Sequence, residues 1–168
     1  SIMTSIIKVD TIQTSAGGTP TASSLGIGGV GKIGQVVYGS TTTQVGSTSS
    51  TYADTNLSAS ITPSSASSKV LVLISMNCFI IGGSASSLDI NIVRDSTTVI
   101  EYDRALYKAD SATETQLFFQ YLDSPSTTGA TNYKSQMRRG SGAETVLTTY
   151  ADSNGQSIST ITLMEVLA

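Results

Sequence analysis

Short runs in which apolar and polar residues alternate dominate this chain, and apolar residues at helical spacing are not sustained anywhere. Leu88, Ile90 and Ile92 alternate with Asp89 and Asn91, which is the period of a strand with one face on a core and one in water. Clusters of Gly, Ser, Asn and Asp interrupt these runs about every 8 to 12 residues. The pattern predicts an all-β protein.

The β-prone runs predict ten strands, and the turn residues Arg94, Asp95 and Ser96 predict a tight hairpin between two of them. About ten strands in about 135 residues are typical of a two-sheet, antiparallel β-sandwich of jelly-roll type. The predicted strands cover Ile33–Tyr38, Thr51–Asp54, Leu57–Thr62, Lys69–Phe79, Leu88–Arg94, Thr97–Tyr102, Thr115–Asp123, Thr131–Arg138, Thr145–Tyr150 and Ile158–Val166.

One predicted strand is apolar on both of its faces. Every residue from Val70 to Ile74 is apolar, and strands of this kind are covered on both sides. We expect either the second sheet together with a neighbouring loop, or another copy of the chain, to provide the cover.

The chain divides into residues 1–31 and a compact β-sandwich domain of residues 32–168. Residues 1–31 hold one β-prone segment, Thr4–Gln13, followed by the Gly-, Ser- and Thr-rich tract Ser15–Gly31. A strand as short as this cannot bury its own apolar side chains. They must be covered by the chain's own sandwich, by two other copies of the chain or by the surface of a larger assembly. The flexible tract favours the last two, and we expect the segment to anchor the protein through Ile6, Ile7, Val9 and Ile12.

The chain contains few of the side chains that carry out chemistry near neutral pH. Almost a third of the 168 residues are Ser or Thr, His is absent, and charged residues make up 12%. We expect the single Cys78 to be a buried small hydrophobe, and we expect no cofactor and no metal. The net charge of −3 with scattered cations argues against nucleic-acid binding, and the longest apolar run is too short for membrane insertion.

Two motifs suggest chemistry and are discounted. The run Gly26–Gly31 fits G-x-G-x-x-G, but it lacks the preceding buried strand and the following helix that hold a phosphate. Glu101 and Asp103 share one face of a strand, as a pair of glycosidase carboxylates could, but solvated surface charges explain them more simply. We expect no enzyme activity, and cleavage of a surface glycan is the one enzyme class to be tested.

Aromatic and basic residues mix most densely between Glu101 and Asp110, with a second small cluster near Tyr133. Tyr and Arg provide rigid contact area and planar hydrogen bonding, which recognition surfaces favour. The simpler interpretation is ordinary loop solubility. The candidate receptor contacts are Tyr102, Asp103, Arg104, Tyr107, Lys108, Tyr133, Arg138 and Arg139.

Five segments, in their order along nearly the whole chain, resemble fibre-type virion structural proteins of tailed bacteriophages, especially those of marine bacteria and cyanobacteria. Each motif is low in complexity, and their order carries the resemblance. The segments are Ile6–Gln13, Gly31–Val37, Leu57–Ser65, Lys69–Leu73 and Ser159–Glu165.

The resemblance implies a homotrimeric fibre of the virion, assembled in the host cytoplasm. Its N-terminal segment would bind other virion proteins of the baseplate, tail or capsid, and its C-terminal sandwich would form a knob similar to trimeric jelly rolls of the tumour necrosis factor and C1q type. The knob would bind a host cell-surface glycan or protein. The chain is short for a long tail fibre, so a capsid fibre or decoration protein that stabilises the shell is the alternative, and a glycan depolymerase a more remote one.

Overall fold

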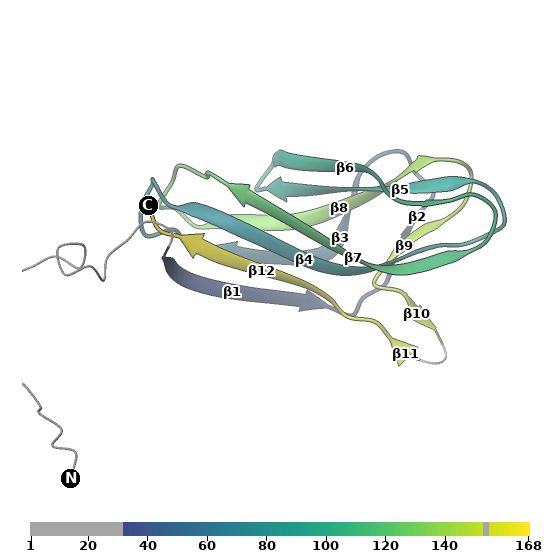
Figure 1. The fold of residues 1–168 in the computed structure, drawn as a ribbon, viewed down its shortest axis with the longest axis horizontal. Helices are drawn as coiled ribbons and strands as arrows, with labels where there is room; N and C mark the ends of the chain where they lie inside the picture. Colours follow the sequence, from purple (N-terminus) through teal and green to yellow (C-terminus); the bar gives the residue numbers. More distant parts are fainter. Residues whose placement is uncertain (1–31, 153–154) are drawn as a thin grey trace, which may run out of the picture.

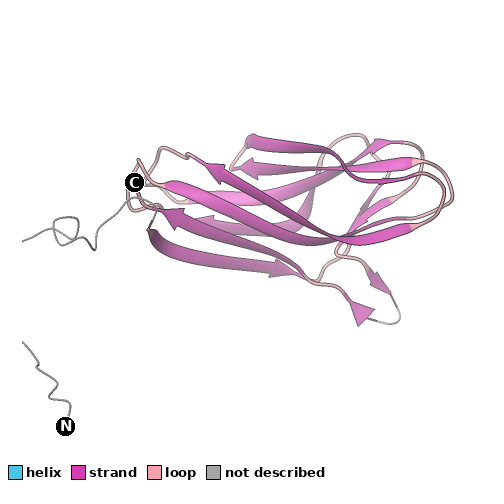
Figure 2. Ribbon diagram, in the orientation of Figure 1, coloured by secondary structure: helices cyan, strands magenta, loops and turns pink. Residues whose placement is uncertain are grey.

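The computed structural model describes residues 32–152 and 155–168, which form packed antiparallel β-sheets without a helix (Figures 1 and 2). The prediction of an all-β sandwich is confirmed. Within these residues, no helix is long and apolar enough to cross a membrane. The predicted anchoring residues Ile6, Ile7, Val9 and Ile12, with the rest of residues 1–31, lie outside the described part.

Two sheets face each other. Sheet A contains, in spatial order, β1 (Ile33–Thr41), β12 (Ser159–Val166), β4 (Lys69–Ile80) and β7 (Thr113–Asp123), and the short strands β9 (Val146–Thr148) and β2 (Val45–Ser47) continue it along the end of β4. Sheet B contains β3 (Ala53–Ile61), β8 (Thr131–Ser141), β5 (Ser86–Arg94) and β6 (Thr97–Lys108). A separate ribbon pairs β10 (Ala151–Asp152) with β11 (Gly155–Gln156).

The core lies between the two sheets and is filled by alternate residues of their strands. Val70, Val72 and Ile74 of β4 are buried on the inner face of sheet A, and Ile90 and Ile92 of β5 belong to the same core cluster. Such burial of aliphatic side chains is the main favourable term in folding.

The single thiol belongs to this core as well. Cys78 of β4 is fully buried, as predicted, and burial raises its pKa to about 12. A thiol in this state is a packing group and not a nucleophile.

Strand predictions hold best for the long, strongly patterned strands. The hairpin at Asp95 and Ser96 joins β5 to β6 as predicted. The two predicted strands on either side of Asn56 are a single strand, β3, whose pairing with β8 is interrupted where Asn56 adopts a φ of 60°. Strand β6 does not end at Tyr102 but continues to Lys108, and the short β2, β10 and β11 were not predicted.

The expectation that one face of β5 lies in water is wrong. Asp89 and Asn91 are only 3% and 2% exposed. Strand β5 is central in sheet B, so side chains of both neighbouring strands lie against its outer face: Arg138 of β8 binds Asp89, and Thr98 of β6 lies 3.5 Å from the amide nitrogen of Asn91.

Candidate binding site on the outer face of sheet B

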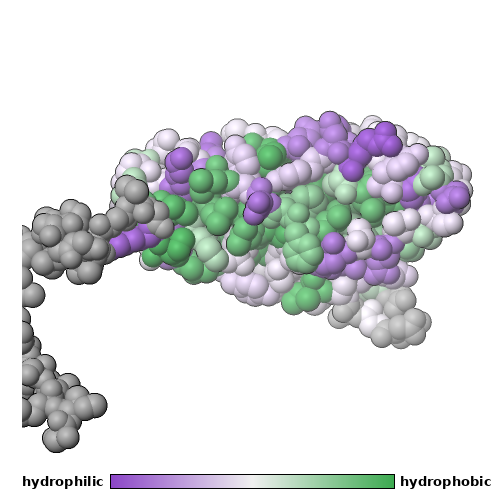
Figure 3. All heavy atoms as spheres, in the orientation of Figure 1, coloured by the Kyte–Doolittle hydropathy of each residue, from purple (hydrophilic) through white to green (hydrophobic). Residues whose placement is uncertain are grey.

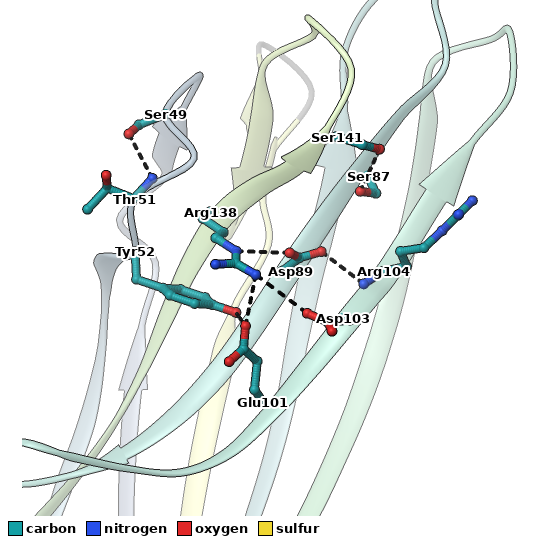
Figure 4. A network of polar contacts seen from close by, with 10 residues as sticks. All are labelled: Ser49, Thr51, Tyr52, Ser87, Asp89, Glu101, Asp103, Arg104, Arg138 and Ser141. Atoms are coloured by element: carbon teal, nitrogen blue, oxygen red, sulfur yellow. Dashed lines mark hydrogen bonds and ion pairs between the residues drawn. The ribbon is translucent and has the colours of Figure 1, made fainter.

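A cluster of charged side chains covers the outer face of sheet B, with Arg138 at its centre (Figure 4). The guanidinium of Arg138 donates from Nε to Asp89 Oδ2 at 2.9 Å and from Nη2 to Glu101 Oε1 at 2.9 Å. Asp103 Oδ1 lies 3.5 Å from the same Nη2. One cation from β8 is therefore held by three carboxylates from β5 and β6.

Asp89 is the buried anchor of this cluster. Its second oxygen, Oδ1, accepts a hydrogen bond of 2.9 Å from the backbone N–H of Arg104, where β6 has a positive φ of 51° and its pairing with β5 is irregular. On the other side, Gly140 of β8 has no Cβ, and a Cβ there would collide with the Asp89 carboxylate. Both local features make room for a buried carboxylate whose two oxygens are occupied.

Tyr52, just before β3, closes the cluster from the side. Its ring centroid lies 4.5 Å from Cζ of Arg138, and its hydroxyl donates to Glu101 Oε1 at 2.7 Å. Burial raises the pKa of Tyr52, and the hydrogen bond to Glu101 raises it further. The hydrogen bond to Asp89 raises the pKa of Arg138. Tyr52 and Arg138 therefore keep their protons, and so their donor roles, at neutral pH.

A recess of about 320 Å³ opens beside this cluster. Hydroxyls of Ser87 and Ser141, 2.9 Å apart, form part of its wall, and Arg104 forms another part with its guanidinium 4.2 Å above the Tyr107 ring. The recess is lined by Ser87, Asp89, Asp103, Arg104, Arg138, Gly140 and Ser141. The recess therefore presents hydrogen-bond donors on cations and acceptors on carboxylates, and all of these groups are carried by β-strands.

The structure brings four of the predicted contact residues together here. Asp103, Arg104 and Arg138 line the recess, and Tyr107, which is 45% exposed, lies under Arg104. Arg139 is half-buried beside the cluster, and its backbone N–H donates to Ser49 at 2.8 Å.

Three other predicted contacts turn away from this surface. Tyr133 is fully buried and donates to Asp123 Oδ2 at 2.7 Å, and Lys108 is 3% exposed and donates to the Gly82 carbonyl at 2.7 Å. Both are corrected to structural residues, because a buried side chain with its own partner is not available to a receptor. Tyr102 is half-buried against Phe119, with ring centroids 4.8 Å apart.

The residues of this site that the sequence did not suggest as contacts are Tyr52, Ser87, Asp89, Gly140 and Ser141. Asp89 could be placed on the outer face from its alternation with Leu88 and Ile90. The register that sets it opposite Arg138 is not visible in the sequence, because the two residues are 49 positions apart along the chain.

Among the described residues, no group of three or more Asp, Glu, Cys or His side chains is arranged to hold a metal ion. The chain matches no model of a known protein family, and no curated protein is similar to it.

Proposed function

We propose that this protein is a non-enzymatic structural protein of a virion: a trimeric phage tail fibre that attaches by its N-terminal segment and presents its sandwich as a knob for binding the host surface. The observation that carries the proposal is the mixed-charge recess on the outer face of sheet B. Its groups stand on rigid strands, and rigid placement lowers the entropy cost of binding a ligand.

The chemistry of the recess suits a polyhydroxylated ligand such as a surface glycan. Sugar hydroxyls both donate and accept hydrogen bonds, and the recess offers acceptors on Asp103, donors on Arg104, and the Ser87 and Ser141 hydroxyls, which do both. A polar loop of a host surface protein would use the same groups.

The carboxylates of the cluster favour binding over turnover. Both oxygens of Asp89 are occupied, and Glu101 and Asp103 are held by one nitrogen of Arg138. A glycosidase needs two carboxyl groups on either side of the scissile bond, one of them able to give up a proton. Three carboxylates gathered around one guanidinium therefore favour a binding surface over a catalytic pair.

The strand order supports a jelly-roll assignment. The four long strands β1-β12-β4-β7 face β3-β8-β5-β6, and from β3 to β9 the chain changes sheet at every connection except the β5–β6 hairpin. Double-sheet jelly rolls have eight strands arranged as two Greek keys.

Binding is tested with the labelled full-length protein on intact bacteria and on an array of their isolated surface polysaccharides. We expect saturable binding that Arg104→Ala weakens about tenfold, since loss of a central interface Arg costs more than about 1 kcal/mol. Lys69→Ala removes a cation at the end of sheet A and serves as the matched control. Failure to bind any cell or polysaccharide would contradict host attachment, and new reducing ends would contradict a non-enzymatic role.

The place on the particle is tested with gold-labelled antibodies against the chain. We expect gold at the tail of virions of the phage that encodes the chain. Gold over the icosahedral shell would instead establish the alternative, a capsid decoration protein.

A further inference from the structure

The outer face of sheet A differs from that of sheet B because its middle carries no charge, and the exposed Lys69 of β4 and Glu114 of β7 stand at its two opposite ends. We call the uncharged part the neutral face. Among its side chains, Leu122, Leu71, Met164 and Val36 stand opposite one another in a single row across β7, β4, β12 and β1. The neutral face consists of Ile33, Val36, Tyr38, Leu71, Leu73, Ser75, Phe118, Gln120, Leu122, Thr160, Thr162 and Met164.

Exposed hydrophobic side chains concentrate on this face. Five of the eight large hydrophobic side chains that are exposed among the described residues belong to it, and Phe118 is the most exposed at 76%. Figure 3 shows hydrophobic residues gathered over β4, β7 and β12. Leu71 and Leu73, which lie in the run that is apolar on both faces, stay half-buried. An apolar patch of this extent on a soluble protein marks an interaction site.

The neutral face is large enough for a stable protein interface. Strands β1, β12, β4 and β7 have 9, 8, 12 and 11 residues, and at about 4.8 Å spacing and about 3.3 Å per residue they cover roughly 630 Å². One partner contributes about 600–1,000 Å² to an interface of standard size. A small ligand would leave most of such a face uncovered.

The neutral face has both a protruding side chain and a hollow, so that two copies of it can fit together. Phe118 stands on the edge strand β7, and beside it lies a trough of about 570 Å³ whose lining includes the smaller side chains of Ser75, Thr160 and Thr162. A ridge and a trough on the same surface allow a second copy to place its Phe118 where the first copy is hollow. A face without charge also brings no like charges together when identical copies meet.

We propose that the neutral face is the self-association surface of this protein, with Phe118 of one copy seated in the Thr160–Thr162 trough of the next. The interface stands on the geometry of sheet A, whereas the number of three copies rests on the proposed function. In this arrangement the charged outer face of sheet B points away from the contact and stays open to ligand.

The test is the mass of the full-length protein in solution, measured by sedimentation equilibrium at micromolar concentration. We expect the wild type at three times the chain mass of 17.4 kDa. Phe118→Ser removes the ridge and Thr162→Arg fills the trough with a charge, and we expect each to raise the dissociation constant at least a hundredfold. Thr97→Arg places the same charge on exposed β6 of sheet B and leaves the mass unchanged. Circular dichroism checks that each variant keeps its β-structure.

Each outcome separates the interface from the stoichiometry. A wild-type dimer that both variants dissociate would support the neutral face and overturn the trimeric fibre. A monomeric wild type would overturn the interface, and so would an oligomer that Phe118→Ser and Thr162→Arg leave intact, since residues 1–31 or another surface would then form the contact.

Discussion

At the scale of single residues, the buried carboxylates are the most demanding feature of this chain. Asp89, Asp123 and Glu165 are each less than 7% exposed, and a buried charge is tolerated only when partners satisfy it. Asp123 accepts hydrogen bonds from both Arg94 and Tyr133. Asp89 and Glu165 each accept hydrogen bonds on both of their oxygens as well. Substitutions that remove a hydrogen-bond partner of one of these carboxylates should therefore lower the free energy of unfolding more than other polar substitutions do.

Arg138→Ala leaves Asp89 buried without its main cation. We expect the free energy of unfolding to fall by about 2 kcal/mol, below the full cost of breaking a buried pair because Arg138 itself is partly exposed. Arg139→Ala, one residue away and with no carboxylate within ion-pair distance among the described residues, should change it by less than about 0.5 kcal/mol. Urea unfolding at pH 7 measures both. Equal losses would show that the Asp89 pair contributes nothing specific.

Glu165 is predicted to make stability depend on acid. Burial alone would raise its pKa, but hydrogen bonds from Gln35 and Ser64 outweigh burial and lower the pKa to about 2. Because the folded pKa lies below the unfolded one, the carboxylate stabilises the fold above about pH 4.5, and this contribution is lost as the pH falls toward 2.

Glu165→Gln removes that contribution. We expect it to lower the free energy of unfolding by about 1–2 kcal/mol at pH 7 and by much less at pH 2. Melting temperatures of the wild type and the variant between pH 2 and 7 test this, with Asp110→Asn as an exposed control. A difference that does not narrow toward pH 2 would be inconsistent with the lowered pKa.

At the scale of elements, the pattern of apolar residues identified the long strands well. β4 and β12 follow their predicted limits closely, because the apolar positions Val70, Val72 and Ile161, Leu163 mark the inner faces directly. Single-residue irregularities were less visible. Asn56 interrupts the pairing of β3 with β8 without ending the strand. Residues 103–108 look like a charged loop because their outer side chains bind across the sheet.

The candidate site could be predicted in part for the same reason. Asp103, Arg104, Tyr107 and Arg138 stood out by residue type, but type alone did not distinguish them from Tyr133 and Lys108, which face inward. Orientation depends on strand register, and the irregular pairing around Arg104 shifts that register locally. Burial of Asp89 depends on side chains from two other strands, which no local pattern contains.

The irregularity in β3 gives a prediction at this scale. Asn56 has a φ of 60°, a left-handed conformation that costs most L-residues about 1 kcal/mol or more. We expect Asn56→Ala to lower the free energy of unfolding by about 1 kcal/mol and Asn56→Gly to change it by less than about 0.5 kcal/mol. Chemical denaturation of both variants decides the point, and an alanine variant as stable as the glycine variant would speak against the left-handed backbone.

At the scale of the whole molecule, the two outer faces of the sandwich have different characters. Sheet A offers the neutral face with Phe118 at its edge, and sheet B offers a charged recess around Arg138. An assembly that buries the first face and displays the second would use both. An arrangement of this kind is what the proposed function requires.

Stability of the whole molecule should change little near neutral pH. The chain has no His. The pKa values of Cys78 and Tyr52 are raised and that of Glu165 is lowered, so all three lie further from the interval between pH 6 and 8 than their ordinary values do. We expect a nearly constant melting temperature over that interval. A change of more than about 8 °C for a domain of this size would contradict the expectation.

Hydroxyl-radical footprinting of the full-length protein, read by mass spectrometry, tests most directly whether the neutral face is buried and the charged face displayed. In a single chain Phe118 and Tyr38 are the most exposed aromatic side chains, at 76% and 61%, ahead of Tyr107 at 45%. We predict that Phe118 and Tyr38 are protected at micromolar concentration while Tyr107 is oxidised, and that Thr162→Arg restores oxidation of Phe118. Fast oxidation of Phe118 in the wild type, at the rate of the variant, would contradict the account.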